Sequence, residues 1–184
     1  MNNRIPTIDP TTATGHTAGL LTAVKAKLGV VPNLVRTFAL SPAVLEGYLG
    51  FTGALAKGVL PARVREQLAL AIAEVNGCDY CLSAHSLLGK GAGLTPEAIE
   101  AARRGEAADP KEGALLQFAR EVVATRGQVS DEALAAVRAA GASDAELVEV
   151  VAQVAANILT NYTNNVARTQ IDFPRAKPLA VAAA

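Results

Sequence analysis

The chain has 184 residues, of which 51% are hydrophobic and only 4% aromatic, and its 17 Lys and Arg balance its 17 Asp and Glu. This length suits one domain with a substantial core, so we predict a single domain over residues 1–184. A balanced charge without a block of Lys or Arg argues against nucleic-acid binding, because no run of phosphates would be neutralised.

Apolar segments with helical periodicity follow one another along the chain, separated by glycine, proline or a Ser, Thr or Asp cap. A composition rich in alanine and poor in aromatic residues favours helices that pack closely through small side chains. The predicted helices cover residues 17–28, 33–40, 42–57, 61–75, a segment that holds the cysteines and ends among the glycines at 89–93, and residues 96–104, 111–126, 130–141 and 144–168. No strand-type alternation competes with this pattern, so we predict an all-α fold, a helical bundle.

An internal repeat is indicated, because parts of the chain match themselves at an offset of 83 residues. Five residues then fall on identical ones: Gly58 on Gly141, Ala62 on Ala145, Glu66 on Glu149, Ala69 on Ala152 and Ala73 on Ala156. We predict two related halves, an active half at about residues 42–94 and a degenerate repeat at about residues 130–170. The second copy lacks thiols, since Asn161 and Asn164 stand where the first has Cys78 and Cys81. A chance match of two alanine-rich helices is the alternative.

The two cysteines, Cys78 and Cys81, stand where one predicted helix ends at Gly77 and the next begins. Unpaired amides and the helix macrodipole favour an anion at such a helix N-terminus, so a thiolate is favoured there. His85 lies four residues after Cys81 on the same helix face, where its imidazole can exchange a proton with the sulfur. A disulfide between Cys78 and Cys81 would close too short a loop to stabilise the fold much. Two cysteines at this spacing are more often redox-active or metal-binding than structural.

Glu66 lies on the helix that precedes the cysteines, with alanines three and seven residues further on along its own face. These small residues let the next helix approach, so we interpret Glu66 as part of a proton relay with His85. The alternative is a surface ion pair between Glu66 and Arg63 or Arg65.

Three other interpretations of the cysteines stay open at this point. With His85 and Glu66 they could form a zinc site, although zinc normally takes four ligands and the other histidine, His16, is far away in the sequence. A thioredoxin fold would need a strand before the motif, and none is predicted. The cysteines could also be two small buried hydrophobic residues.

The residues Glu66, Cys78, Tyr80, Cys81 and His85 lie in a pattern that resembles a known signature. This is the Glu…Cys-x-x-Cys-x-x-x-His signature of the alkylhydroperoxidase D branch of the carboxymuconolactone decarboxylase-like superfamily. The flanking segments 28–34, 40–42 and 161–174 resemble its uncharacterised peroxidase-related subgroup. The resemblance implies an all-α fold of two related helical halves that assembles as a trimer or hexamer.

The resemblance also implies roles for these residues. Cys81 would attack the peroxide, Cys78 would be the resolving thiol, and Glu66 and His85 would relay protons. Tyr80 stands where well-studied members have a histidine, and a tyrosine with a pKa near 10 cannot shuttle protons at neutral pH as histidine does. Tyr80 therefore completes the set of candidate catalytic residues but puts the rate and substrate range in question.

The expected function is a thiol-dependent peroxidase that reduces organic hydroperoxides without a metal, flavin or haem cofactor. An external dithiol, a lipoyl group or a thioredoxin-like protein, would reopen the Cys78–Cys81 disulfide. The alternatives are a dithiol relay or redox sensor that acts on a protein partner, and a lactone decarboxylase that needs no thiols. Because the sequence has no long apolar segment, we expect a cytoplasmic protein that does not bind membranes. Because its charge is near neutral and its composition apolar, we also expect a homo-oligomer.

Overall fold

The structure is a computed structural model that describes residues 3–179, and within them it contains nine helices and no strand. The helices are α1 (Gly15–Leu28), α2 (Asn33–Phe38), α3 (Pro42–Leu55), α4 (Ala62–Val75), α5 (Asp79–Gly91), α6 (Pro96–Arg104), α7 (Pro110–Thr125), α8 (Asp131–Ala139) and α9 (Asp144–Ala167). Each one corresponds to a predicted helix. The all-α fold class is therefore confirmed.

The helix starts follow from local hydrogen bonding. Four helices begin at a cap whose side-chain oxygen accepts an orphan backbone N–H, namely Thr95, Asp109, Ser130 and Ser143. At Ser143 the exchange is reciprocal, because the Glu146 carboxylate accepts the N–H of Ser143 at 2.8 Å. Pro61 differs from its predicted place in the first turn. It is the residue before α4, with an extended backbone, and the helix begins at Ala62.

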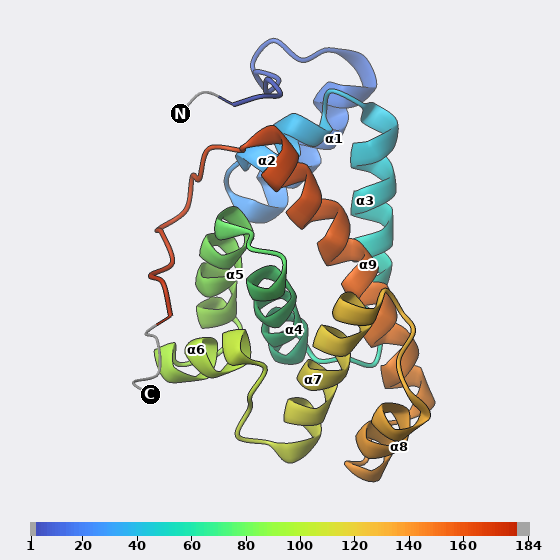
Figure 1. The fold of residues 1–184 in the computed structure, drawn as a ribbon. Coiled ribbons are helices and arrows are strands. Elements are labelled where there is room, and N and C mark those ends of the chain that lie inside the picture. Colours follow the sequence, from blue (N-terminus) through green and yellow to red (C-terminus); the bar gives the residue numbers. More distant parts are fainter. Residues whose placement is uncertain (1–2, 180–184) are drawn as a thin grey trace.

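Helix α4 lies at the centre of the bundle and packs against α5, α6, α7 and α9 (Figure 1). Every residue from Gln67 to Ala73 is buried, and from Leu68 onward this stretch is apolar on all sides rather than on one stripe. The three alanines in this stretch let the neighbouring helices come close. The position of α4 fixes Glu66 at its start and the thiols of α5 just beyond its end.

The proposed internal repeat pairs α4 with the first part of α9. The break that follows α4 at Gly77, where the backbone has a φ of +59°, has no counterpart in the second copy, because α9 continues without interruption to Ala167. The two matching glutamates also make different contacts. The carboxylate of Glu149 accepts the N–H groups of Val59 and Leu60 at 2.7 and 3.0 Å, just before α4 begins. The relation between two halves stays a prediction.

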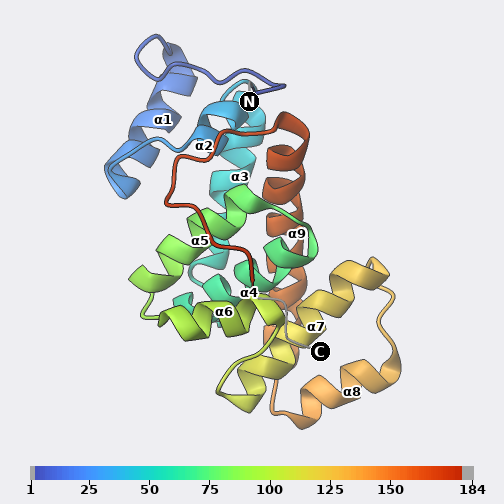
Figure 2. The ribbon, with the colours of Figure 1, turned by 60° about the vertical axis from the view of Figure 1, so that its left-hand side comes forward.

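The segment after α9 runs back across the bundle in an extended conformation, past α5 to α6 (Figure 2). The N–H of Ala176 donates to the Ser83 hydroxyl at 3.1 Å, and the buried Arg103 donates to the carbonyl of Lys177 at 2.7 Å. The C-terminal segment thus lies on its own chain as far as residue 179, and residues 180–184 lie outside the described part. Among the described helices, none has the length and apolar character needed to cross a membrane.

Two leucines on adjacent helices test the central position of α4. Leu70 is fully buried on α4, whereas Leu87 on α5 keeps 46% of its surface exposed. We expect Leu70→Ala to lower the free energy of unfolding by about 2–5 kcal/mol, because it removes core contacts and leaves a cavity. Leu87→Ala is the matched control and should lower it by less than about 1 kcal/mol. Equal losses in chemical denaturation would contradict this packing.

Candidate active site

The two thiols lie at the start of α5, as the sequence predicts. Cys78 is the N-cap of this helix, and its sulfur accepts the backbone N–H of Cys81 at 3.3 Å. Both cysteines are free thiols, and both are buried, with exposed fractions of 0% and 2%. The turn at Gly77 brings the chain from the end of α4 directly into this cap, so the helix start and the cysteine pair are one structural unit.

The environment of Cys81 favours its thiolate. A hydrogen bond from the Cys78 thiol, the nearby charge of His85 and the side-chain amide of Asn164 lower the pKa of Cys81 to about 7, against the opposing effect of burial. The Asn164 Nδ2 atom lies 3.3 Å from the Cys81 sulfur. The same hydrogen bond, together with burial, raises the pKa of Cys78. At neutral pH a larger share of Cys81 is therefore thiolate than of an ordinary cysteine, which is only roughly 3% thiolate at pH 7, while Cys78 keeps its proton.

Glu66 and His85 form a pair between α4 and α5, with 2.7 Å between the carboxylate Oε2 and the imidazole Nδ1. Burial disfavours the charged imidazole, but the carboxylate outweighs it and, with the Cys81 charge, raises the pKa of His85. The alternative pairing with neighbouring arginines is wrong. Arg63 pairs with Glu112, and Arg65 donates to the carbonyl of Leu60.

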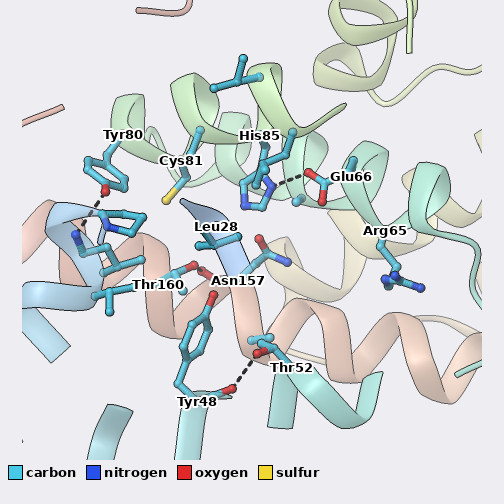
Figure 3. A pocket seen from close by; sticks show the side chains of 18 of the residues that line it. Leu28, Tyr48, Thr52, Arg65, Glu66, Tyr80, Cys81, His85, Asn157 and Thr160 are labelled. Atoms are coloured by element: carbon cyan, nitrogen blue, oxygen red, sulfur yellow. Dashed lines mark hydrogen bonds and ion pairs between the residues drawn. The ribbon is translucent and has the colours of Figure 1, made fainter. Parts of the chain in front are cut away.

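Tyr80 is placed differently from the other predicted site residues. Its hydroxyl accepts the N–H of Leu34 on α2 at 3.1 Å, and its ring meets Phe173 edge-on with 5.5 Å between the centroids. Burial raises the pKa of Tyr80, and the nearby Asp172 carboxylate raises it further. The hydroxyl points to α2, away from the Glu66–His85 pair (Figure 3). Tyr80 therefore connects α5 to α2 and to the C-terminal segment.

A cavity of about 420 Å³ opens beside Cys81, between α1 to α5, α9 and the C-terminal segment (Figure 3). Glu66, Tyr80, Cys81 and His85 line it, and Cys78 does not. Most of the remaining wall is apolar, including Val24, Leu28, Val35, Leu49, Leu88 and Phe173. Of the two thiols, a small molecule in this cavity would therefore contact that of Cys81.

Several polar residues of the site do not appear in the predicted set. Tyr48 on α3 and Gln153, Asn157 and Thr160 on α9 line the cavity, and Asn164 contacts Cys81. The α9 residues recur every three or four positions among the apolar residues of its buried face, and they form a stripe of buried polar side chains. Such a stripe facing the core indicates a polar site, and this spacing was the available signal.

The zinc interpretation finds no support in this arrangement. Within residues 3–179, no three His, Cys, Asp or Glu side chains gather closely enough to hold a metal ion. His16, the remaining histidine, lies on α1 and pairs with the exposed Glu46 of α3 at 3.2 Å.

Comparison with known proteins finds a matching family. The sequence profile of the carboxymuconolactone decarboxylase family matches residues 42–124, which span α3 to α7 and contain Glu66, both cysteines and His85. Over these residues, a little under half of the chain, the sequence matches this family, and the fold is that of alkylhydroperoxidase D. The resemblance seen in the sequence is thereby confirmed. No curated protein matches the sequence significantly.

Three solved structures illustrate the likeness. An uncharacterized peroxidase-related protein from Ralstonia eutropha JMP134, described as an alkylhydroperoxidase AhpD core, is 23% identical with a TM-score of 0.83, and the match covers 94% of this chain and 93% of that one. An uncharacterized peroxidase-related protein from Silicibacter sp. TM1040 is 20% identical with a TM-score of 0.78, covering 91% and 89%. A cysteine-to-alanine variant of the debrominase Bmp8, in complex with 2,3,4-tribromopyrrole, is 19% identical with a TM-score of 0.77, covering 94% and 93%. At these identities the likeness shows the fold.

The Glu66–His85 pair should tune the Cys81 thiolate. In Glu66→Gln the neutral amide no longer raises the pKa of His85, so the imidazole loses its charge at lower pH and supports the thiolate less. Alkylation of Cys81 by iodoacetamide should therefore rise with pH through a midpoint near 7 in the wild type and through a higher midpoint in the variant.

The exposed Glu46–His16 pair provides the matched control for this measurement. Glu46→Gln also breaks a contact between a glutamate and a histidine, but at a distance from the thiols, and should leave the midpoint unchanged. An unchanged midpoint in Glu66→Gln would show that the pair does not act on Cys81.

Proposed function

We propose that this protein is a thiol-dependent peroxidase that reduces organic hydroperoxides through a dithiol–disulfide cycle of Cys78 and Cys81. The observation that carries the proposal is the unequal environment of the two thiols. Cys81 faces the cavity with its pKa lowered to about 7, and Cys78 lies behind it with its pKa raised. A thiolate attacker backed by a protonated second thiol is the arrangement that peroxide reduction by a cysteine pair requires.

The first step is a nucleophilic displacement at oxygen. The Cys81 thiolate attacks the outer oxygen of the hydroperoxide and forms an S–O bond while the O–O bond breaks. The alkoxide that leaves takes up a proton and becomes an alcohol, and Cys81 becomes a sulfenic acid. The Glu66–His85 pair lines the same cavity and can supply that proton through the imidazole.

The second step closes the disulfide. The Cys78 sulfur attacks the sulfenic acid of Cys81, the S–S bond forms, and water leaves with the proton of the Cys78 thiol. In sum, one hydroperoxide and two thiols give one alcohol, one water and one disulfide. Because Cys81 is only 2% exposed, the external dithiol that restores the thiols must enter the cavity, which favours a slender lipoyl group over a folded thioredoxin-like protein.

The alternatives predicted from the sequence fit this geometry less well. A relay or sensor that acts on a protein disulfide would need an attacking thiol at the surface, and both cysteines are buried. A lactone decarboxylase would use Glu66 and His85 and would not need the tuned thiolate. Retained lactone turnover in Cys81→Ser together with lost peroxidase activity would favour it.

Reductive debromination is a second candidate, favoured by the mostly apolar cavity that is large enough for a small aromatic ring. The fold is shared with a debrominase bound to 2,3,4-tribromopyrrole. The Cys81 thiolate would take the bromine, the ring carbon would take a proton, and Cys78 would then displace bromide to form the same disulfide. Bromide release from 2,3,4-tribromopyrrole at a higher rate than the reduction of cumene hydroperoxide would establish this function instead.

We also propose a homo-oligomer, with a trimer or hexamer as the expected state. The outer face of α9 exposes a row of apolar side chains that no described segment covers: Val148, Val151, Leu159, Tyr162 and Val166, with exposed fractions of 41–70%. Such a row is typical of an interface between subunits. A monomer mass in light scattering would contradict the proposal.

Thiol counting tests the peroxidase cycle. One equivalent of cumene hydroperoxide should remove both thiols of the reduced protein and about two mass units per chain, because two hydrogens leave as the disulfide forms. Neither Cys78→Ala nor Cys81→Ala should form the intramolecular disulfide. Unchanged thiols and mass in the wild-type protein would overturn the proposed function.

A further inference from the structure

Tyr48 of α3 enters the cavity from the side opposite the thiols. Its ring is held edge-on against Phe38, with 5.1 Å between the centroids, and its hydroxyl points into the cavity toward the side where Cys81 and His85 lie (Figure 3). Burial, with the negative charges of Cys81 and Glu66, raises the pKa of Tyr48 to about 12. The hydroxyl therefore carries its proton at every pH at which Cys81 reacts.

The other hydroxyls of the cavity already have protein partners. The Thr52 hydroxyl donates to the carbonyl of Tyr48, the Thr160 hydroxyl donates to the carbonyl of Asn157, and the Tyr80 hydroxyl accepts the N–H of Leu34. Within residues 3–179 the Tyr48 hydroxyl has no hydrogen-bond partner, and only burial and the charges of Cys81 and Glu66 act on it. A protonated donor that faces an apolar cavity without a protein partner is placed to bind an oxygen of a ligand.

Peroxide cleavage creates a need for such a donor. As the O–O bond breaks, negative charge develops on the leaving oxygen, and an alkoxide is a poor leaving group unless a donor stabilises it. The attacking sulfur lies at one wall of the cavity, between the Asn164 amide and the start of α5. The leaving oxygen, in line with the attack, points away from that wall and toward the side that Tyr48 occupies.

We propose that Tyr48 is a further catalytic residue, whose hydroxyl donates a hydrogen bond to the leaving oxygen of the hydroperoxide. This inference rests on the proposed peroxidase function and extends it. Tyr48 stabilises the developing alkoxide, and the net proton comes from the Glu66–His85 pair, so tyrosinate need not form. The substrates that gain from this donor are alkyl and aralkyl hydroperoxides, because the alkoxides that leave from them are strongly basic.

Leaving-group dependence tests the proposal in the full-length protein. Tyr48→Phe removes the hydroxyl but keeps the ring against Phe38. The rate of Cys81 oxidation by cumene hydroperoxide should fall about 100-fold, the size expected for one lost oxyanion donor. Oxidation by peracetic acid should fall by less than about threefold, because its carboxylate leaves without help. Alkylation by iodoacetamide, which needs a thiolate but no proton donor, should not change.

The other two tyrosines serve as controls. Tyr80→Phe removes a hydroxyl that binds Leu34, so it should change the rates with cumene hydroperoxide and peracetic acid by the same factor. Tyr162→Phe removes an exposed hydroxyl on α9 and should leave both rates unchanged.

The possible failures can be told apart. If the wild-type protein does not react with cumene hydroperoxide, the proposed function fails. If the wild type reacts but Tyr48→Phe is as fast, or is slowed equally with peracetic acid and iodoacetamide, Tyr48 is not the donor and this inference is overturned.

Discussion

A buried thiolate at Cys81 depends on hydrogen bonds that replace water around its sulfur. Charge in a buried site is costly unless polar partners surround it, and here the Cys78 thiol and the Asn164 amide supply them, with the charge of His85 nearby. Lowering a cysteine pKa from about 8.5 to about 7 corresponds to about 2 kcal/mol in favour of the thiolate. Nucleophilicity falls with pKa, so a value near 7 is close to the optimum for attack at neutral pH.

The scaffold explains how one face of Cys81 stays reactive. The turn at Gly77 makes Cys78 the cap of α5, so the thiol proposed to resolve sits behind the one proposed to attack. Helix α9 brings the Asn164 amide to 3.3 Å from the same sulfur. The amide oxygen of Asn164 is buried without a partner among the described residues. If the amide were turned over, its nitrogen would leave the sulfur and this oxygen would face the thiolate instead, which would be repulsive.

Much of the fold and of the reacting set could be predicted from the sequence. Caps, prolines and glycines fix the helix ends locally, so the predicted helix ends agree with those of the structure within a few residues. The Cys78, Cys81 and His85 spacing lies within one helix start, and its geometry follows from the helix itself. Placing Glu66 in the site requires a contact between α4 and α5, and the alanines on its own face of α4 predict that contact.

Residues from distant helices could not be predicted in the same way. Tyr48 reaches the site only through the packing of α3, and a single tyrosine carries no local signal of that packing. Asn164 belongs to the polar stripe of α9, whose spacing indicates a buried polar face but not its contact with Cys81. Tyr80 lies within the Cys-x-x-Cys motif, yet its hydroxyl accepts the N–H of Leu34. The motif does not encode this contact with α2. The contact between Cys81 and Asn164, which the offset of 83 residues pairs, is what a two-fold relation between halves would produce near its axis.

The central claim is that Cys81, and not Cys78, is the thiol that attacks. It is tested most directly by reacting Cys78→Ser and Cys81→Ser with cumene hydroperoxide in the presence of dimedone and locating the adduct by peptide mass. The account predicts a rapid dimedone adduct on Cys81 in Cys78→Ser and little adduct on Cys78 in Cys81→Ser. Adduct formation on Cys78 at an equal or higher rate would contradict it.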